Sequence, residues 1–288
     1  MPFIKQLDKD FVIKDNHFEL TPDYLKDSWK FKKITGTRLS AIIGRNKYTS
    51  PFKVWCCMVG IYSEPIDPTL AKLGMYVEPK VRDYVSKQLN IKFKDYVPAE
   101  VKWDVFKGKT DPGYEMFGGI PDGEPVNASG IVDYSTGNPM LEIKTSSIDA
   151  FVYKTEKGLL HMQKEPNGLP LVKEQGKKKL SWFGDDGKLK ISDEYMYQLG
   201  LYLFLRKINK GLFAVCFLER EDYAHPENFK IENHEVYLRG FGFSDVNKFK
   251  AQVVDPARDW YIKHVKTGIS PEMTEADKKW LKEVELLK

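Results

Sequence analysis

The clearest hydrophobic pattern in the chain lies between residues 140 and 147. Leu141 and Ile143 are apolar, and Glu142 and Lys144 alternate with them. A period of two predicts a strand whose successive side chains point to opposite faces. Leu141 and Ile143 are therefore expected to face a core, while Glu142 and Lys144 share the other face.

A long apolar segment from 192 to 205 predicts a helix in the core of the fold. Ser192 precedes it as an N-cap, and acidic residues follow in its first turn. Gln198 and Tyr202 are four residues apart and are expected to project from one face of this helix. The run 212–218 is too short and too rich in β-branched and aromatic residues for a helix, so it is predicted to be a buried strand.

Three further helices are predicted before residue 90. Apolar residues recur with a helical period from 70 to 85, and Pro79 is expected to kink or divide this helix near Glu78. Shorter helices are predicted over 35–43 and over 51–59, where a proline begins the second helix and a glycine follows its end.

The middle of the chain predicts strands joined by tight turns. The segments 91–106, 115–122 and 130–134 alternate weakly and are interpreted as strands. Together with a turn over 135–139, they predict a meander that leads into the strand 140–147 rather than repeated βαβ units.

The C-terminal part predicts a strand around 235–238 and two amphipathic helices at about 244–266 and 274–286. The chain has no internal repeat and no clean linker, so a single domain over 1–288 is expected. From these elements we predict an α/β fold with helices at the N-terminus and a helical C-terminal extension at 240–288.

Composition narrows the class of protein without identifying a site. Apolar residues make up 42% and charged residues 30% of the chain, which is typical of a folded soluble domain. The sequence has no apolar run near the ~18 residues of a membrane span and no signal-peptide core, so a cytoplasmic protein is expected. Three cysteines argue against a disulfide framework. A net charge of +4 permits a nucleic-acid partner without requiring one.

The acidic residues near the strand 140–147 suggest a metal-dependent hydrolase. Asp122 lies between a proline and a glycine, upstream of the pair Glu142 and Lys144. Mg²⁺ binds through one or two carboxylates plus phosphate oxygens, and a nearby lysine can position or deprotonate the attacking water. The five histidines show no zinc-ligand spacing, and no serine-hydrolase, P-loop or dinucleotide motif is present.

Five short motifs in the right order resemble the PD-(D/E)XK nuclease superfamily, and within it the phage-type exonucleases related to lambda exonuclease and the YqaJ-like viral recombinases. They are Lys33-Ile34-Thr35-Gly36-Thr37, Gly74-Met75-Tyr76-Val77-Glu78-Pro79, Pro121-Asp122-Gly123, Glu142-Ile143-Lys144 and Gln198 with Tyr202. The resemblance covers roughly residues 29–220. It implies a restriction-endonuclease-like core over these residues, with a central mixed β-sheet flanked by helices and a basic insertion at 150–190.

The resemblance implies a role for each matching residue. Glu78, Asp122, Glu142 and the backbone carbonyl of Ile143 would hold Mg²⁺, with Mn²⁺ as a substitute. Asp122, Glu142, Lys144 and Gln198 would be the catalytic residues. The N-terminal motif of the family lies near the terminal phosphate of the DNA strand, so the expected DNA contacts are Lys30, Thr37, Arg38 and Ser40, together with Tyr202.

Two departures from the family pattern leave alternatives open. Nineteen residues separate Asp122 from Glu142, so an inserted hairpin is expected, and Asp133 is an alternative to Asp122 as the metal-binding aspartate. The segment 150–190 is longer and more basic than the minimal fold requires. Its Lys177-Lys178-Lys179 run is interpreted either as a solvated face or as a contact to a DNA backbone.

The resemblance implies an Mg²⁺-dependent exonuclease that degrades linear double-stranded DNA from the 5′ end in phage-type recombination. A single-strand annealing protein and assembly into a trimer are the implied partnerships. Two alternatives stay open. One is a structure-specific or restriction-type endonuclease of the same superfamily, and the other is a DNA-binding module that has lost its activity.

Overall fold

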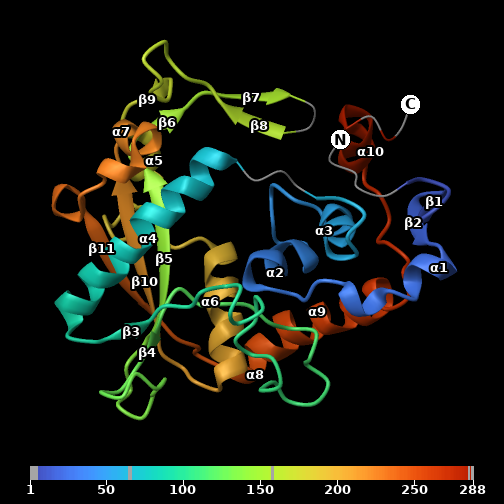
Figure 1. The fold of residues 1–288 in the computed structure, drawn as a ribbon, viewed down its shortest axis with the longest axis horizontal. Helices are drawn as coiled ribbons and strands as arrows, with labels where there is room; N and C mark the ends of the chain where they lie inside the picture. The colour runs from blue at the N-terminus through green and yellow to red at the C-terminus, as the bar shows by residue number, and fades with distance from the viewer. Residues whose placement is uncertain (1–5, 64–66, 157–158, 285, 287–288) are drawn as a thin grey trace.

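The computed structural model describes residues 6–63, 67–156, 159–284 and 286. A mixed three-stranded sheet lies on the left side of the molecule in Figure 1. The middle strand, β10 (Gly211–Leu218), pairs in parallel with β5 (Met140–Ser147) and antiparallel with β11 (Val236–Phe241). An antiparallel bridge between Gly123 and Leu141 continues the sheet beyond β5. The predicted α/β class with a mixed central sheet is confirmed.

The remaining elements surround this sheet. The strands are β1 (Phe11–Lys14), β2 (His17–Leu20), β3 (Phe93–Lys94), β4 (Glu124–Pro125), β6 (Ala150–Phe151), β7 (Tyr153–Glu156), β8 (Leu159–Met162) and β9 (Val172–Glu174). The α-helices are α1 (Pro22–Leu25), α2 (Gly36–Ile42), α3 (Pro51–Met58), α4 (Pro68–Leu89), α5 (Lys177–Leu180), α6 (Asp193–Arg206), α7 (Arg220–Ala224), α8 (Val246–Phe249), α9 (Asp255–Trp260) and α10 (Glu275–Glu283). Short 3₁₀ and π-helical segments are η1 (Ser28–Lys30), η2 (Pro226–Asn228), η3 (Ile231–Asn233), η4 (Lys250–Val254) and η5 (Tyr261–Val265).

Both faces of the sheet are covered, so β10 is buried along its whole length. Alternate side chains of β10 enter two separate apolar clusters. Phe213, Val215 and Phe217 pack in the cluster that contains the apolar residues of α6, whereas Ala214 and Cys216 pack in the cluster that contains those of α4. The uninterrupted apolar run that predicted this strand reflects burial from both sides.

The predicted meander before β5 is wrong, because only one of its first three segments contains a strand. After β5, the chain reaches β10 through a crossover that contains α6, and these two strands are parallel. Of the segment 91–106, only β3 is a strand, and Lys102 and Trp103 have positive φ angles that interrupt an extended backbone. The segments 115–122 and 130–134 form turns with single bridges. Their apolar residues anchor loops to the core, which alternation alone does not distinguish from a strand.

The helix α4 runs without interruption past Pro79, contrary to the predicted division near Glu78. Pro79 and Met75 are exposed, so the carbonyl that loses its hydrogen bond at this proline faces water. The continuous helix keeps Leu73, Val77 and Val81 on one buried face. Glu78 is exposed and lies next to Val77 of that buried face. The uninterrupted helix therefore places Glu78 there without the break predicted at Pro79.

The C-terminal part is helical as predicted, with a run from Val246 to Val265 followed by α10. This run lies along the lower edge of the molecule, near α2 and α6 (Figure 1). The basic segment 150–190 forms β6–β9 with the β7–β8 hairpin, which projects from the body, and α5. Within the described ranges, no helix has the length and apolarity needed to cross a membrane.

Candidate active site

The strand β5 places Glu142 and Lys144 on the face of the sheet that α6 covers. Glu142 is fully buried, and its Oε1 accepts a hydrogen bond of 2.7 Å from Lys144 Nζ. The same Nζ donates to Gln198 Oε1 on α6 at 3.1 Å. Leu141 and Ile143 point into the opposite cluster beneath α4. The predicted division of faces along this strand is confirmed.

Asp122 is held beside this pair by the backbone. Its Oδ2 accepts a hydrogen bond of 2.7 Å from the Ile143 amide, and Arg82 Nε on α4 donates to the Asp122 carbonyl at 2.7 Å. The alternative, Asp133, lies at a surface turn, where its Oδ1 accepts from the Ser135 amide at 2.8 Å. The structure therefore brings Asp122, and not Asp133, to Glu142 and Lys144.

Three carboxyl groups in this region have a raised pKa. Burial and the charge of Asp122 raise the pKa of Glu142 to about 8. Glu78 is exposed at the rim, but partial desolvation and Asp122 raise its pKa to about 7. Burial also raises the pKa of Asp122. Burial would lower the pKa of Lys144, but Glu142 and Asp122 outweigh it, so the pKa is raised and the lysine stays charged.

The carboxylate cluster fits a divalent cation. Glu142 Oε2 is buried and has no hydrogen-bond partner among the described residues, which is costly for a carboxylate oxygen. Across all the described residues, no group of three or more His, Cys, Asp or Glu side chains is close enough together to hold a metal ion by itself. A partial set of hard oxygen ligands is nevertheless what Mg²⁺ uses when substrate and water supply the rest. Glu78, Asp122 and Glu142 are the residues that would hold it.

A cleft opens from these groups to the surface, and we call it the acidic cleft. Glu78, Asp95 and Asp122 line it together with Thr35, Thr37 and Tyr202. Asp95 forms an ion pair of 2.9 Å with Arg82, the residue that also holds the Asp122 backbone. The cleft thus gives a polymer access to the carboxylates from outside.

The predicted DNA contacts are placed unevenly around this cleft. Thr37 is exposed and lines it, and Tyr202 forms its buried wall, stacked on Phe106 at 5.6 Å between ring centroids. Arg38 is half-buried, and its Nη1 donates to the Lys33 carbonyl at 2.9 Å. Lys30 is exposed outside the cleft lining, where it pairs with Asp27 at 2.6 Å.

The expectation for Ser40 is contradicted. Ser40 is only 2% exposed, and its Oγ accepts a hydrogen bond of 3.2 Å from Asn46 Nδ2. Like Leu39, Ala41 and Ile42, it belongs to the buried C-terminal part of α2, whereas Thr37 lies exposed in the first turn. A buried hydroxyl cannot reach a DNA backbone.

Two aromatic residues support the lysine and were not predicted from the sequence. Tyr195 on α6 lies under Lys144, with Nζ 4.7 Å from the ring centroid. Trp182 stacks on Tyr195 at 5.6 Å, and its Nε1 donates to Ser146 Oγ on β5 at 2.9 Å. The basic segment 150–190 thereby contributes a side chain to the core beneath the site. A tryptophan inside a lysine-rich segment was the available signal.

A buried ion pair fixes the backbone next to Asp122. Glu124 is fully buried, and Arg206 at the end of α6 donates to it twice, through Nε and Nη2, each at 2.6 Å. Tyr134 donates to the same carboxylate at 2.9 Å, and the Tyr96 hydroxyl donates to its other oxygen. These three partners lie 82, 10 and 28 residues from Glu124 in the sequence, so no local sequence signal indicated them.

Gly36 sets the distance between α2 and α6. A Cβ at this position would lie 2.5 Å from Gln198 Cγ and 2.9 Å from Gln198 Cα. We expect Gly36→Ala to lower the free energy of unfolding by about 1–3 kcal/mol, because the helix backbones must separate. The same movement takes Gln198 away from Lys144. Chemical denaturation measures the first effect and nucleotide release the second.

Gly240→Ala is the matched control for that substitution. A Cβ there meets nothing within 4 Å, and the position lies on the edge strand β11. Its effect on stability is expected to stay within about 0.5 kcal/mol. If Gly36→Ala is as stable and active as Gly240→Ala, close packing at Gly36 does not position Gln198.

Known proteins resemble this chain in sequence, in structure and in domain family. An uncharacterised protein of Mycoplasma genitalium is 47% identical, with 98% of this chain and 99% of the relative covered. An uncharacterised homologue from Mycoplasma pneumoniae is 45% identical over the same shares. An alkaline exonuclease from Laribacter hongkongensis superposes with a TM-score of 0.47 at 12% identity, covering 91% of this chain and 96% of that one. Residues 27–205 match the YqaJ-like viral recombinase domain. The chain therefore belongs to the YqaJ-like viral recombinase domain family, and with it to the nucleases of the phage exonuclease type.

Proposed function

We propose that this protein is an Mg²⁺-dependent exonuclease that hydrolyses phosphodiester bonds of linear double-stranded DNA from 5′ to 3′ in phage-type recombination. The observation that carries the proposal is the buried Glu142 Oε2, which has no hydrogen-bond partner in the described part of the chain and lies beside a charged lysine and two further carboxylates. Mn²⁺ is the expected substitute for Mg²⁺. A trimer and a single-strand annealing partner belong to the proposal through the family alone.

The contacts of these residues support the role proposed for each. A bound divalent cation would supply Lewis-acid stabilisation of charge on the phosphate and lower the pKa of a water. Asp122 is oriented by the Ile143 amide, so its free oxygen is available as a ligand. Lys144 is protonated and can donate a hydrogen bond that orients the attacking water or a phosphate oxygen. Gln198 fixes the ammonium through its Oε1.

The remaining roles concern the substrate. Thr37 is exposed in the acidic cleft and presents a hydroxyl to the DNA backbone. Tyr202 closes the inner wall, and a Cβ on Gly119 would approach its hydroxyl within 2.6 Å, so this wall is tightly packed. Arg38 adds a positive charge close enough to influence Tyr202. Together these groups favour a phosphate chain that enters along the cleft and ends at the carboxylates.

Exonuclease and endonuclease activity are separated by the form of the DNA. We expect the protein with Mg²⁺ to release nucleotides from a linearised plasmid and to leave the closed circular form intact. Gel electrophoresis of both forms over time measures the difference. Cleavage of the closed circle would favour the structure-specific or restriction-type endonuclease instead. If neither form releases nucleotides with any divalent metal tested, the result favours the other alternative, a DNA-binding module that has lost its activity.

Strand polarity is tested with linear duplexes labelled at one terminus and carrying either a 5′-phosphate or a 5′-hydroxyl. A 5′-to-3′ enzyme releases the 5′ label as a mononucleotide at the start of the reaction. Early release of a 3′ label would reverse the proposed direction. A slower rate on the 5′-hydroxyl end is the result expected if the groups around Thr37 bind the terminal phosphate.

Metal binding is expected to stabilise the fold independently of activity. At a metal concentration ten times the Kd, the gain is about 1.4 kcal/mol, or roughly a 3–6 °C rise in Tm for a domain of this size. Differential scanning fluorimetry with Mg²⁺, Mn²⁺ or EDTA measures it. Glu142→Gln should lose most of this shift, whereas Asp133→Asn should keep it. An equal shift in both variants would remove Glu142 from the metal site.

A further inference from the structure

A second cleft lies beside Tyr195, and we call it the basic cleft. Its lining includes Arg45, Lys47 and Tyr48 from the loop after α2, Lys178 from α5, Lys190, and Tyr195 from α6. Asp193 and Glu194 also line it. Four cations against two carboxylates leave an excess of two positive charges at neutral pH.

The cations of the basic cleft are available to a ligand. Arg45, Lys47, Lys178 and Lys190 are exposed and form no ion pair within the described ranges. The neighbouring lysines on α5 differ, because Lys177 pairs with Glu174 at 3.8 Å and Lys179 pairs with Glu235. Of the three consecutive lysines, the structure therefore directs one into the cleft and neutralises the other two.

The basic cleft also carries an exposed aromatic ring. Tyr48 is 83% exposed, although an aromatic side chain usually buries most of its surface. Its hydroxyl lies close enough to raise the pKa of Tyr195. Exposed aromatic rings among unpaired cations are typical of surfaces that bind single-stranded nucleic acid, where bases stack on the rings and phosphates meet the cations. A duplex offers no free base face to such a ring.

The basic cleft is joined to the active site through Tyr195. One side of this residue lines the cleft, and Lys144 Nζ lies 4.7 Å from its ring centroid. Lys144 in turn contacts Glu142 and Gln198. Two side chains, Tyr195 and Lys144, therefore connect the lining of the basic cleft to Glu142.

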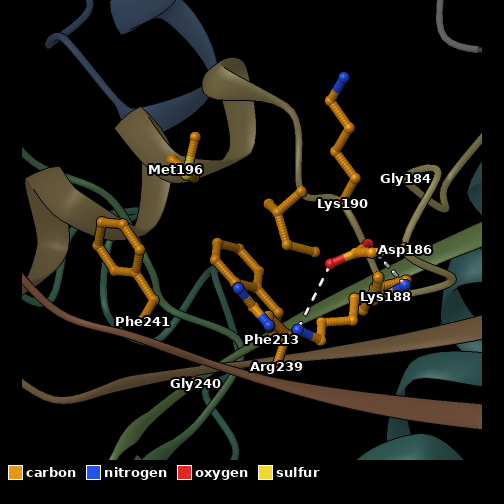
Figure 2. Close-up of a pocket in the computed structure, with 11 residues that line it drawn as sticks. Gly184, Asp186, Lys188, Lys190, Met196, Phe213, Arg239, Gly240 and Phe241 are labelled. Carbon is orange, nitrogen blue, oxygen red and sulfur yellow. Dashed lines mark hydrogen bonds and ion pairs between the residues drawn. The ribbon is translucent and has the colours of Figure 1, made fainter.

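Positive charge continues beyond Lys190 into a neighbouring depression, shown in Figure 2. Met196, Phe213 and Phe241 form its apolar side, and Lys190 points away from them, which agrees with its place in the basic cleft. On the rim, Lys188 pairs with Asp186 at 3.5 Å, whereas Arg239 has no ion pair in the described part of the chain. The unpaired cations thus follow a path from the loop after α2 to β11.

We propose that the basic cleft binds a single strand of nucleic acid that is continuous with the strand in the active site, with phosphates on Lys178 and Lys190 and a base stacked on Tyr48. The inference rests on the proposed function for the identity of the polymer. It adds a site, outside the carboxylate cluster, for those nucleotides of the hydrolysed strand that have separated from the complementary strand. Such a site would hold the strand in register while its end is hydrolysed.

Binding without hydrolysis tests this proposal. The full chain is titrated in EDTA against a fluorescein-labelled oligothymidylate of about 20 nucleotides and against a duplex of equal length, and anisotropy is recorded at several salt concentrations. For Lys178→Ala/Lys190→Ala, we expect about tenfold weaker binding of the single strand. The slope of log K against log salt should fall by about 1.4, because each phosphate contact on a single strand contributes about 0.7. Tyr48→Ala should weaken binding about tenfold with little change in slope.

The matched control is Lys278→Ala/Lys282→Ala, which removes two positive charges from α10, on the opposite side of the molecule from α5 (Figure 1). If it changes the slope as much as the cleft variant does, or if duplex and single strand lose affinity equally, the proposal is overturned. Wild-type binding by the cleft variant also overturns it. The salt slope is measured without turnover, so it supports or overturns the cleft site even if the chain hydrolyses no DNA.

Discussion

Replacing Lys144 with alanine is expected to slow nucleotide release from linear duplex DNA by about 10³-fold, within the range that a positioned proton donor or acceptor contributes. Lys144 Nζ is the only described group that contacts both Glu142 Oε1 and Gln198 Oε1. Alanine removes the ammonium from between them and cannot orient a water. Initial rates with saturating Mg²⁺ measure the loss.

The fold of the Lys144→Ala variant must be checked, because the substitution leaves Glu142 buried without its cation. The raised pKa of Glu142 lets that carboxyl bind a proton instead, so near-ultraviolet circular dichroism should stay close to wild type. Lys282→Ala on α10 removes an exposed lysine and should retain the wild-type rate. A Lys144→Ala preparation that is as fast as Lys282→Ala would end the catalytic assignment of Lys144.

The largest effect on stability is expected from Arg206→Ala, at about 3–5 kcal/mol of unfolding free energy. Arg206 is the cation of the Glu124 carboxylate, which has no exposed surface. Removing one partner of a buried ion pair leaves the other charge unpaired in a poor solvent. Two tyrosine hydroxyls remain on Glu124 and offset only part of this cost. Urea denaturation followed by fluorescence measures the change.

Two further variants make that result specific. Glu124→Gln in the Arg206→Ala background should recover part of the loss, because a neutral amide leaves no buried charge. Asp111→Ala breaks the exposed Lys207–Asp111 pair near the same end of α6, which is expected to cost at most about 1 kcal/mol. If Arg206→Ala costs no more than Asp111→Ala, the buried pair does not hold this part of the fold together.

The Glu124 network also explains how the active site is assembled. Asp122 and Glu124 are two residues apart, and Arg206 connects the second of them to the helix that carries Gln198 and Tyr202. Arg82 holds the Asp122 backbone to α4, the helix that carries Glu78. Buried polar contacts therefore hold the carboxylates at a fixed distance from the helix that carries Gln198 and Tyr202. None of these contacts is between neighbours in sequence.

Local patterns predicted the parts of this protein whose structure depends on near neighbours. The period-two run around Glu142 and Lys144 placed both on one face, because strand geometry alone decides that. The helices α3, α4 and α6 were predicted from apolar periodicity and capping residues. Alternation failed between residues 91 and 134, where isolated apolar side chains fasten loops to the core and produce a similar pattern.

The amino-acid sequence by itself determined which residues can carry the chemistry and on which faces of their own elements they lie. Only the tertiary structure decided that Asp122 rather than Asp133 joins Glu142, that Ser40 is buried, and that Trp182 and Tyr195 support Lys144. The physical reason is the distance in sequence over which each effect acts. Periodicity and capping depend on residues a few positions apart, whereas burial and charge pairing depend on which distant segments the crossover through α6 brings together.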